Sequence, residues 1–257
     1  MRIVGLCILG LVSYVLAVLV LFPASPIVDR IRPQLGPVAL EGVHGRLIKG
    51  NIDRVLSTDD LLPLQVQNVG WTLSPAALFS GGAGASITFD GYGGTGRAKV
   101  QRKFNGDLLI NDFIMNAQAK ELEPLLPIPV ASFAGEITAD ISQIKLVNQL
   151  LNRFDGTLQW RDAVLESPVP ASLGNVTMEI KPDGEQTHVV TIAAAGGEVT
   201  ADGTINVMLN GDFSADLLLT PSADASSAVI DGLSQMVRAD DQGRFRIRQT
   251  GNFNRLM

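Results

Sequence analysis

The sequence predicts an all-β protein with one N-terminal transmembrane helix. We expect one or more long curved antiparallel sheets that form a groove or open barrel, with a few short helices. Three observations predict this fold class: an uncharged apolar run at the N-terminus, alternating apolar and polar residues through most of the remaining chain, and Gly, Asn and Asp between the alternating stretches. A chain of 257 residues is long enough for an anchor and one or two modest domains.

The apolar run covers residues 3–22 and carries no charge. Twenty helical residues span about 30 Å, the thickness of a bilayer core, and a helix satisfies its own backbone groups in lipid. Because Arg2 precedes the run, the positive-inside rule places the N-terminus in the cytoplasm and the bulk of the chain outside it. The residues assigned to this transmembrane anchor include Ile3, Leu11, Val20 and Phe22.

A cleaved signal peptide is the alternative interpretation of the same run. The apolar region of a signal peptide usually has about 7–15 residues, and this run is longer. Phe22 and Pro23 also fit poorly with a small-residue cleavage site, so we expect an uncleaved anchor. Both interpretations carry the rest of the chain out of the cytoplasm.

The anchor and one proline-rich stretch divide the chain. Residues 1–25 are expected to form the cytoplasmic tip and the anchor, and residues 26–257 a β domain outside the cytoplasm. Prolines between residues 124 and 129 interrupt the strand pattern. They indicate a boundary between two β halves, at about residues 38–126 and 130–257.

Alternating residues predict strands throughout the β domain, for example at residues 86–89, 106–110 and 189–192. Turn signals separate the strands at Asn105-Gly106, Pro182-Asp183-Gly184, Asp202-Gly203, Asn210-Gly211 and Asp241-Gln242-Gly243. A glycine also precedes an alternating stretch at residues 135–139, 156–160, 203–207 and 243–247. We expect each of these glycines to supply a positive φ at the end of a turn, which predicts a sheet built hairpin by hairpin.

Three segments predict short helices instead. Residues 74–79 begin with Ser74 and Pro75, which suit the N-cap and the first helical position. Residues 119–126 precede the proline-rich stretch, and residues 225–237 place apolar residues at helical spacing.

Charge and composition argue against several functions. The net charge is −6, and aromatic residues make up 5% of the chain. The sequence contains no extended basic stretch in which aromatic residues are interleaved. This argues against nucleic-acid binding and against broad docking on anionic lipid head groups. The single cysteine, Cys7, lies in the apolar run and has no partner for an internal disulfide.

No motif for catalysis, cofactor binding or a metal stands out. The two histidines, His44 and His188, lack metal-ligand spacing, and no Gly-x-Ser-x-Gly elbow accompanies them. The glycine-rich segments 81–85 and 91–96 lack the context of a phosphate-binding loop and predict hairpin turns. We therefore expect a protein without enzyme activity, cofactor or resident metal.

Three arginines form a candidate partner face. Arg244, Arg246 and Arg248 alternate, so a strand would place them on one side of the sheet. An acidic partner would suit this face, and simple solvation is the alternative.

Several motifs follow one another along nearly the whole chain. Phe22-Pro23-Ala24 ends the apolar run, and residues 42–47 read Gly-Val-His-Gly-Arg-Leu. Trp-Thr-Leu-Ser-Pro stands at residues 71–75, and Gly-Thr-Leu-Gln-Trp-Arg-Asp-Ala at residues 156–163. This order resembles the protein N family of the bacterial type II secretion system. The family landmarks that we interpret as structural are Gly45, Trp71, Pro75, Gly156, Trp160, Gly174 and Gly243.

The two tryptophans are expected to pin strands to the core, and carbohydrate or partner binding is the alternative. One departure concerns the first motif, in which the family commonly has Thr and Trp where this chain has Arg46 and Ile48. Isoleucine keeps an apolar side chain that favours strands, so we expect that strand to form.

The resemblance implies an accessory component of the inner membrane in a Gram-negative envelope. Such a single-pass protein, with its bulk in the periplasm, would support export of folded periplasmic proteins across the outer membrane. Its implied partners are other secretion subunits of the inner membrane and periplasm.

The family is also similar to AsmA-like envelope proteins, whose curved sheets form grooves lined by apolar residues. This similarity implies an alternative, a protein that binds or transfers lipid and holds acyl chains.

Four pairs of expected inward-facing residues distinguish these hypotheses. A filled interior around them indicates a subunit that acts through protein contacts, whereas an open apolar trough indicates lipid binding. The pairs are Leu108/Ile110, Ile137/Ala139, Leu158/Trp160 and Ile205/Val207.

Overall fold

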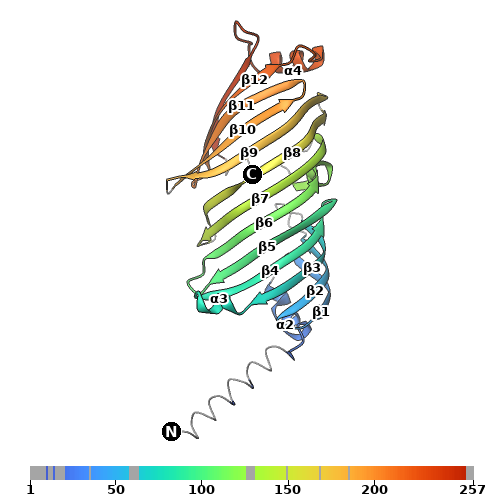
Figure 1. Cartoon of the computed structure of the whole chain (residues 1–257), viewed down its shortest axis with the longest axis vertical. Coiled ribbons are helices and arrows are strands. Elements are labelled where there is room, and N and C mark those ends of the chain that lie inside the picture. The colour runs from blue at the N-terminus through green and yellow to red at the C-terminus, as the bar shows by residue number, and fades with distance from the viewer. Residues whose placement is uncertain are drawn as a thin grey trace.

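The computed structural model describes residues 10, 14, 21–34, 36–57, 64–125, 131–148, 150–167, 169–184 and 186–252. Within these residues the chain forms a 13-stranded sheet in which each strand pairs antiparallel with its neighbours in sequence (Figure 1). The all-β prediction and the long antiparallel sheet are therefore confirmed. The strands are β1 (Val38–Gly45), β2 (Lys49–Ser57), β3 (Gln65–Ser74), β4 (Gly82–Gly91), β5 (Gly94–Lys103), β6 (Leu108–Gln118), β7 (Ser132–Val147), β8 (Leu150–Ser167), β9 (Ala171–Asp183), β10 (Thr187–Gly196), β11 (Val199–Met208), β12 (Asp212–Pro221) and β13 (Phe245–Asn252).

The helices are short and lie between or beside the strands. As predicted, a helical turn follows Ser74-Pro75, a 3₁₀-helix precedes the proline-rich stretch, and an amphipathic helix precedes the last strand. The helices are α2 (Ser25–Ile31), η1 (Arg32–Gln34), α3 (Ala76–Phe79), η2 (Ala119–Leu125) and α4 (Ser227–Met236).

The predicted membrane anchor at residues 3–22 falls almost wholly outside the described residues. Within the described part of the chain, no helix is both long and apolar enough to cross a membrane. The single membrane pass therefore stays a prediction.

The chain segment after residue 21 is fastened to the turn between β1 and β2. The N–H of Ala24 donates to the carbonyl of Gly45 at 3.1 Å, and the N–H of Leu47 donates to the carbonyl of Phe22 at 2.9 Å. Ala24 is buried in this contact. These hydrogen bonds hold the segment close to the β1 end of the sheet.

The sheet has two ends and is continuous between them. β6 pairs with β7 across residues 126–130, so the strands of the two predicted halves belong to one sheet. No ladder joins β1 to β13 in the described structure, so the sheet is not closed. Figure 1 shows β1 and β12 at opposite ends of the long axis. The division of the chain into two halves stays a prediction.

One face of the sheet is apolar. Residues directly opposite each other on neighbouring strands point to the same face. Ile137 lies opposite Trp160, Trp160 opposite Val176, and Val176 opposite Ala194. Ala194 in turn lies opposite Ala201, so an apolar row crosses five strands.

The buried core is thin because a single sheet has no second layer to cover this face. Its buried members are mostly small residues, and no large side chain in the described ranges is fully buried. One covered patch lies under α4, where buried Val229 packs against Ala171 and Val199.

The prediction of a turn at Asp202-Gly203 was wrong. Both residues lie inside β11, opposite Leu218 and Leu217 of β12. A side chain at Gly203 would meet the backbone oxygen of Asp216 at 2.3 Å, so this glycine permits close strand approach.

The expected role of the repeated glycines was likewise wrong at three of the four positions. Gly135, Gly156 and Gly203 lie inside strands, where they face a neighbouring strand at short distance. Gly135 does have a positive φ, and only Gly243 lies in a turn with a positive φ. The repeat therefore marks close contacts between strands at Gly135, Gly156 and Gly203 and a turn at Gly243.

Candidate interaction surfaces

Most of the eight residues expected to face inward are not fully buried. Ala139 is buried, whereas the other seven side chains remain partly exposed. Trp160 and Leu158 of β8 belong to the partly exposed group. Around these positions the apolar face is therefore a partly exposed trough.

An apolar pocket of about 390 Å³ lies between this trough and α4. Its volume lies within the range of small-molecule sites. Trp160 supplies the only side-chain nitrogen or oxygen in the wall, and its Nε1 already donates to the carbonyl of Ala134 at 2.9 Å. The wall thus offers its occupant only apolar contact. Lining residues from the sheet and the helix include Trp160, Met178, Ile192, Leu219, Leu233 and Met236.

Two apolar side chains of α4 are exposed near this pocket. Met236 at the end of α4 is 71% exposed, and Ile230 on the same helix is 40% exposed. Met236 belongs to the pocket wall, so its exposed side chain extends the surface that an apolar ligand can cover, whereas Ile230 does not line the pocket.

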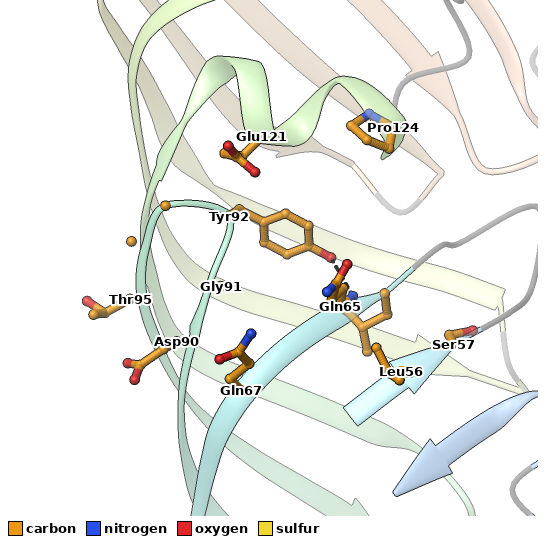
Figure 2. A pocket seen from close by; sticks show the side chains of 13 residues that line it. Leu56, Ser57, Gln65, Gln67, Asp90, Gly91, Tyr92, Thr95, Glu121 and Pro124 are labelled. Carbon is orange, nitrogen blue, oxygen red and sulfur yellow. Dashed lines mark hydrogen bonds between the residues drawn. The ribbon is translucent and has the colours of Figure 1, made fainter. Parts of the chain in front are cut away.

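A second, more polar pocket of about 730 Å³ lies at the other half of the sheet. Figure 2 shows the ring of Tyr92 between Gln65 on one side and Glu121 and Pro124 of η2 on the other. The Tyr92 hydroxyl accepts a hydrogen bond from the N–H of Gln65 at 3.3 Å. Tyr92 lies in the tight turn between β4 and β5 with a φ of 54°, and it lines this pocket.

Both tryptophan landmarks connect parts of the chain that are distant in sequence. Trp71 Nε1 donates to the carbonyl of Leu47 at 3.0 Å, in the same manner as Trp160 bonds Ala134. The Trp71 ring lies over Gly50, where an added Cβ would be 2.3 Å from it. These contacts fit the anchoring role, which stays a prediction.

The remaining landmarks have different surroundings. Gly45 has a φ of 95° beside Gly50, and Gly174 has a φ of 69° beside the carbonyl of Ala195. Gly156 faces Ile141 at close range, and Pro75 is exposed ahead of α3. These residues are spread over the whole sheet and do not converge on one site.

The structure brings together two of the three predicted arginines. Arg246 Nε and Nη2 donate to the two carboxylate oxygens of Asp216 at 2.7 and 2.6 Å, and Arg248 Nε donates at 3.3 Å. These bonds, chiefly the one from Arg246, lower the pKa of Asp216 to about 2. Arg244 lies before β13 and instead pairs with Asp240.

The histidines lie far apart in the sheet. His44 is exposed, with Nε2 3.1 Å from the carboxylate of Asp53. His188 is only 5% exposed, and its Nε2 accepts a hydrogen bond from the N–H of Phe154 at 2.9 Å. Burial, and then the nearby Arg153, lower the pKa of His188. Among the residues with described positions, no cluster of His, Cys, Asp or Glu could hold a metal ion.

The family model for protein N of the type II secretion system matches residues 36–248. The chain belongs to this family. Among its relatives is the type II secretion system protein N of Vibrio cholerae, 28% identical over 221 residues, which cover 82% of this chain and 84% of the relative. Another is the protein of the same name from Aeromonas hydrophila, 28% identical over 251 residues, or 95% and 96% of the two chains. No solved structure matches the chain.

Family membership confirms the resemblance that the ordered motifs predicted. It makes the chain a component of the type II secretion system and therefore of protein transport. The sequence did not predict the apolar pocket, because its wall combines residues from β8 to β12 with residues of α4. Only the helical periodicity of residues 225–237 predicted one of these elements, the helix.

Proposed function

We propose that this protein is an accessory inner-membrane component of the type II secretion system. In this role it supports export of folded periplasmic proteins across the outer membrane through contacts with other secretion subunits. The observation that carries the proposal is the family match over residues 36–248. The uncharged run at residues 3–22 supports a single membrane pass with the β domain in the periplasm.

Deletion of the gene tests this role directly. We expect exported enzymes to accumulate in the periplasm and to fall in the medium, and the full-length chain to restore export. Crosslinking in cells, followed by mass spectrometry, should recover other secretion subunits. Unchanged export together with recovery of phospholipid alone would contradict the proposal.

The proposed topology needs a separate test. A reporter enzyme that is active only outside the cytoplasm is fused to the C-terminus of the full chain. We expect activity in whole cells, because the positive-inside rule leaves the β domain outside. An inactive reporter on a stably produced fusion would overturn the topology without bearing on the role in secretion.

Lipid binding is the second candidate function, and the partly exposed apolar trough favours it. A single sheet with an apolar face leaves this face partly in water unless an apolar ligand covers it. The pocket under α4 could hold part of an acyl chain, since its wall offers only apolar contact.

Two leucine substitutions on α4 test lipid binding. Gly232 lines the pocket, and an added Cβ would lie 3.5 Å from Val169, in ordinary contact. Gly232→Leu should fill the pocket and reduce the phospholipid that copurifies with the full-length protein. Gln235→Leu adds the same side chain at an exposed position of the same helix and should leave the bound lipid unchanged. Equal lipid in both variants would exclude this pocket as the binding site.

A further inference from the structure

The last strand, β13, is an edge of the sheet. It pairs with β12 along one side, and no described strand lies along its other side. An edge strand presents a row of backbone N–H and C=O groups that can pair with another extended chain.

The opposite edge is partly covered. Arg32 Nη2 donates to the carbonyl of Leu40 in β1 at 3.2 Å, and α2 lies next to the same strand (Figure 1). The segment around Ala24 is also hydrogen-bonded to the end of β1. Of the two edges, β13 is therefore the more accessible within the described structure.

Two arginines of β13 lie beside one carboxylate of β12. Arg246 and Arg248 share the single carboxylate of Asp216, which leaves one positive charge unbalanced in this group. The Arg246 bond is bidentate, whereas Arg248 makes one longer bond and its side chain is 66% exposed. Arg248 can therefore turn toward a second carboxylate at little cost.

A second copy of this chain does not fit the edge. In this antiparallel sheet, all odd-numbered strands run in the same direction. If a second copy placed its β1 beside β13, with the apolar faces of both sheets on the same side, the two strands would therefore be parallel. The antiparallel arrangement that keeps the apolar faces together pairs β13 with β13. In the register centred on Ile247, this pairing places Arg246 of one copy opposite Arg248 of the other, and like charges on paired strands repel.

We propose that β13 binds an extended segment of another secretion subunit, which adds a strand to the sheet and places a carboxylate against Arg248. The identity of the partner as a secretion subunit rests on the proposed function. The segment would run antiparallel to β13, with apolar side chains continuing the face of Ile247 and acidic or polar side chains on the face of Arg248.

A photo-crosslinking amino acid at Thr250 tests the inference in the full-length chain in cells. Thr250 is exposed and lies two residues from Arg248, on the same face. We expect an adduct to a secretion subunit, mapped by mass spectrometry to an acidic segment with alternating apolar residues. Absence of a protein adduct, or an adduct to lipid alone, would overturn the inference.

Charge substitutions at Arg248 identify the contact. Arg248→Glu should lower the adduct yield about tenfold, because a charge-assisted hydrogen bond is replaced by repulsion. Arg248→Lys keeps the positive charge and should keep most of the adduct yield. Replacing the mapped partner carboxylate by a basic residue should restore the adduct yield of Arg248→Glu. Arg97→Glu, the same charge change at an exposed position of an interior strand, is the matched control and should have no effect.

These outcomes separate the inference from the proposed function. Equal yields for Arg248→Glu and Arg97→Glu, with unchanged melting temperatures, would exclude the Arg248 contact even if gene deletion blocks export. A charge-dependent adduct to an acidic strand of a protein outside the secretion system would support strand addition and contradict the secretion role.

Discussion

Glycine at position 174 shows how a single residue limits this fold. Its φ is 69°, and an added Cβ would lie 2.3 Å from the carbonyl oxygen of Ala195 on β10. Gly184 has a similar φ of 75°, but nothing lies within 4 Å of its added Cβ. The two positions share the backbone constraint and differ in the available space.

Alanine substitutions at these two positions should therefore differ in cost. Gly184→Ala should lower the free energy of unfolding by about 1 kcal/mol, the cost of a left-handed backbone for an L residue. Gly174→Ala should cost about 3 kcal/mol or more, because β9 must also move away from β10. Chemical denaturation of both variants measures the difference, and equal losses would show that the strands adjust freely.

His188 should make stability depend on pH. Its neutral ring accepts the Phe154 N–H bond, and its pKa in the folded protein lies below the ordinary 6.5. As the pH falls below about 6.5, His188 is protonated in the unfolded chain but stays neutral in the folded protein. The free energy of unfolding therefore decreases as the pH falls further, until the pH is below the pKa of His188 in the folded protein.

Thermal melting between pH 5 and 8 checks this expectation. His188→Gln should remove part of the loss of melting temperature at low pH, whereas His44→Gln, at an exposed histidine, should retain it. A pH dependence that is identical in His188→Gln and the unsubstituted protein would contradict the assignment.

At the scale of elements, α4 depends on the sheet for its stability. A ten-residue helix is marginal in water by itself, and packing of an apolar stripe must stabilise it. Val229 provides the best-buried contact, at 4% exposed, against Ala171 and Val199. Burial of a valine side chain contributes about 2 kcal/mol.

Val229→Asp should release α4 while the sheet stays folded. We expect faster amide hydrogen exchange and faster proteolysis across residues 227–236, with little change in the far-UV β signal. Ile230→Asp places the same charge at a more exposed position of the helix and should have a weaker effect. If α4 stayed protected in Val229→Asp, other contacts would have to hold the helix.

At the scale of the whole molecule, each strand is stabilised by pairing with the strands next to it in sequence. Every strand pairs only with its neighbours in sequence, and the longest strands, β7 and β8, lie in the middle. In such a linear arrangement the edge strands have one neighbour instead of two and can open locally.

Native-state hydrogen exchange should show this gradient. We expect the slowest exchange in β7 to β9 and faster exchange toward β1 and β13. Uniform protection along the sheet would instead indicate one cooperative unit with an interior that supports all strands equally.

The sequence by itself determined the all-β class, the hairpin order, the three helical segments between strands and the family. These depend on local patterns: alternation sets a strand, Asn210-Gly211 sets a turn, and the landmarks around Trp71 and Trp160 follow one another along the chain. The tertiary structure alone decided that Gly203 permits strand contact, that His188 bonds across to Phe154, and that Arg246 and Arg248 share Asp216. It also decided that α4 forms one wall of an apolar pocket. The physical reason is that these features join residues up to several strands apart, and local sequence does not specify the register and curvature that bring them together.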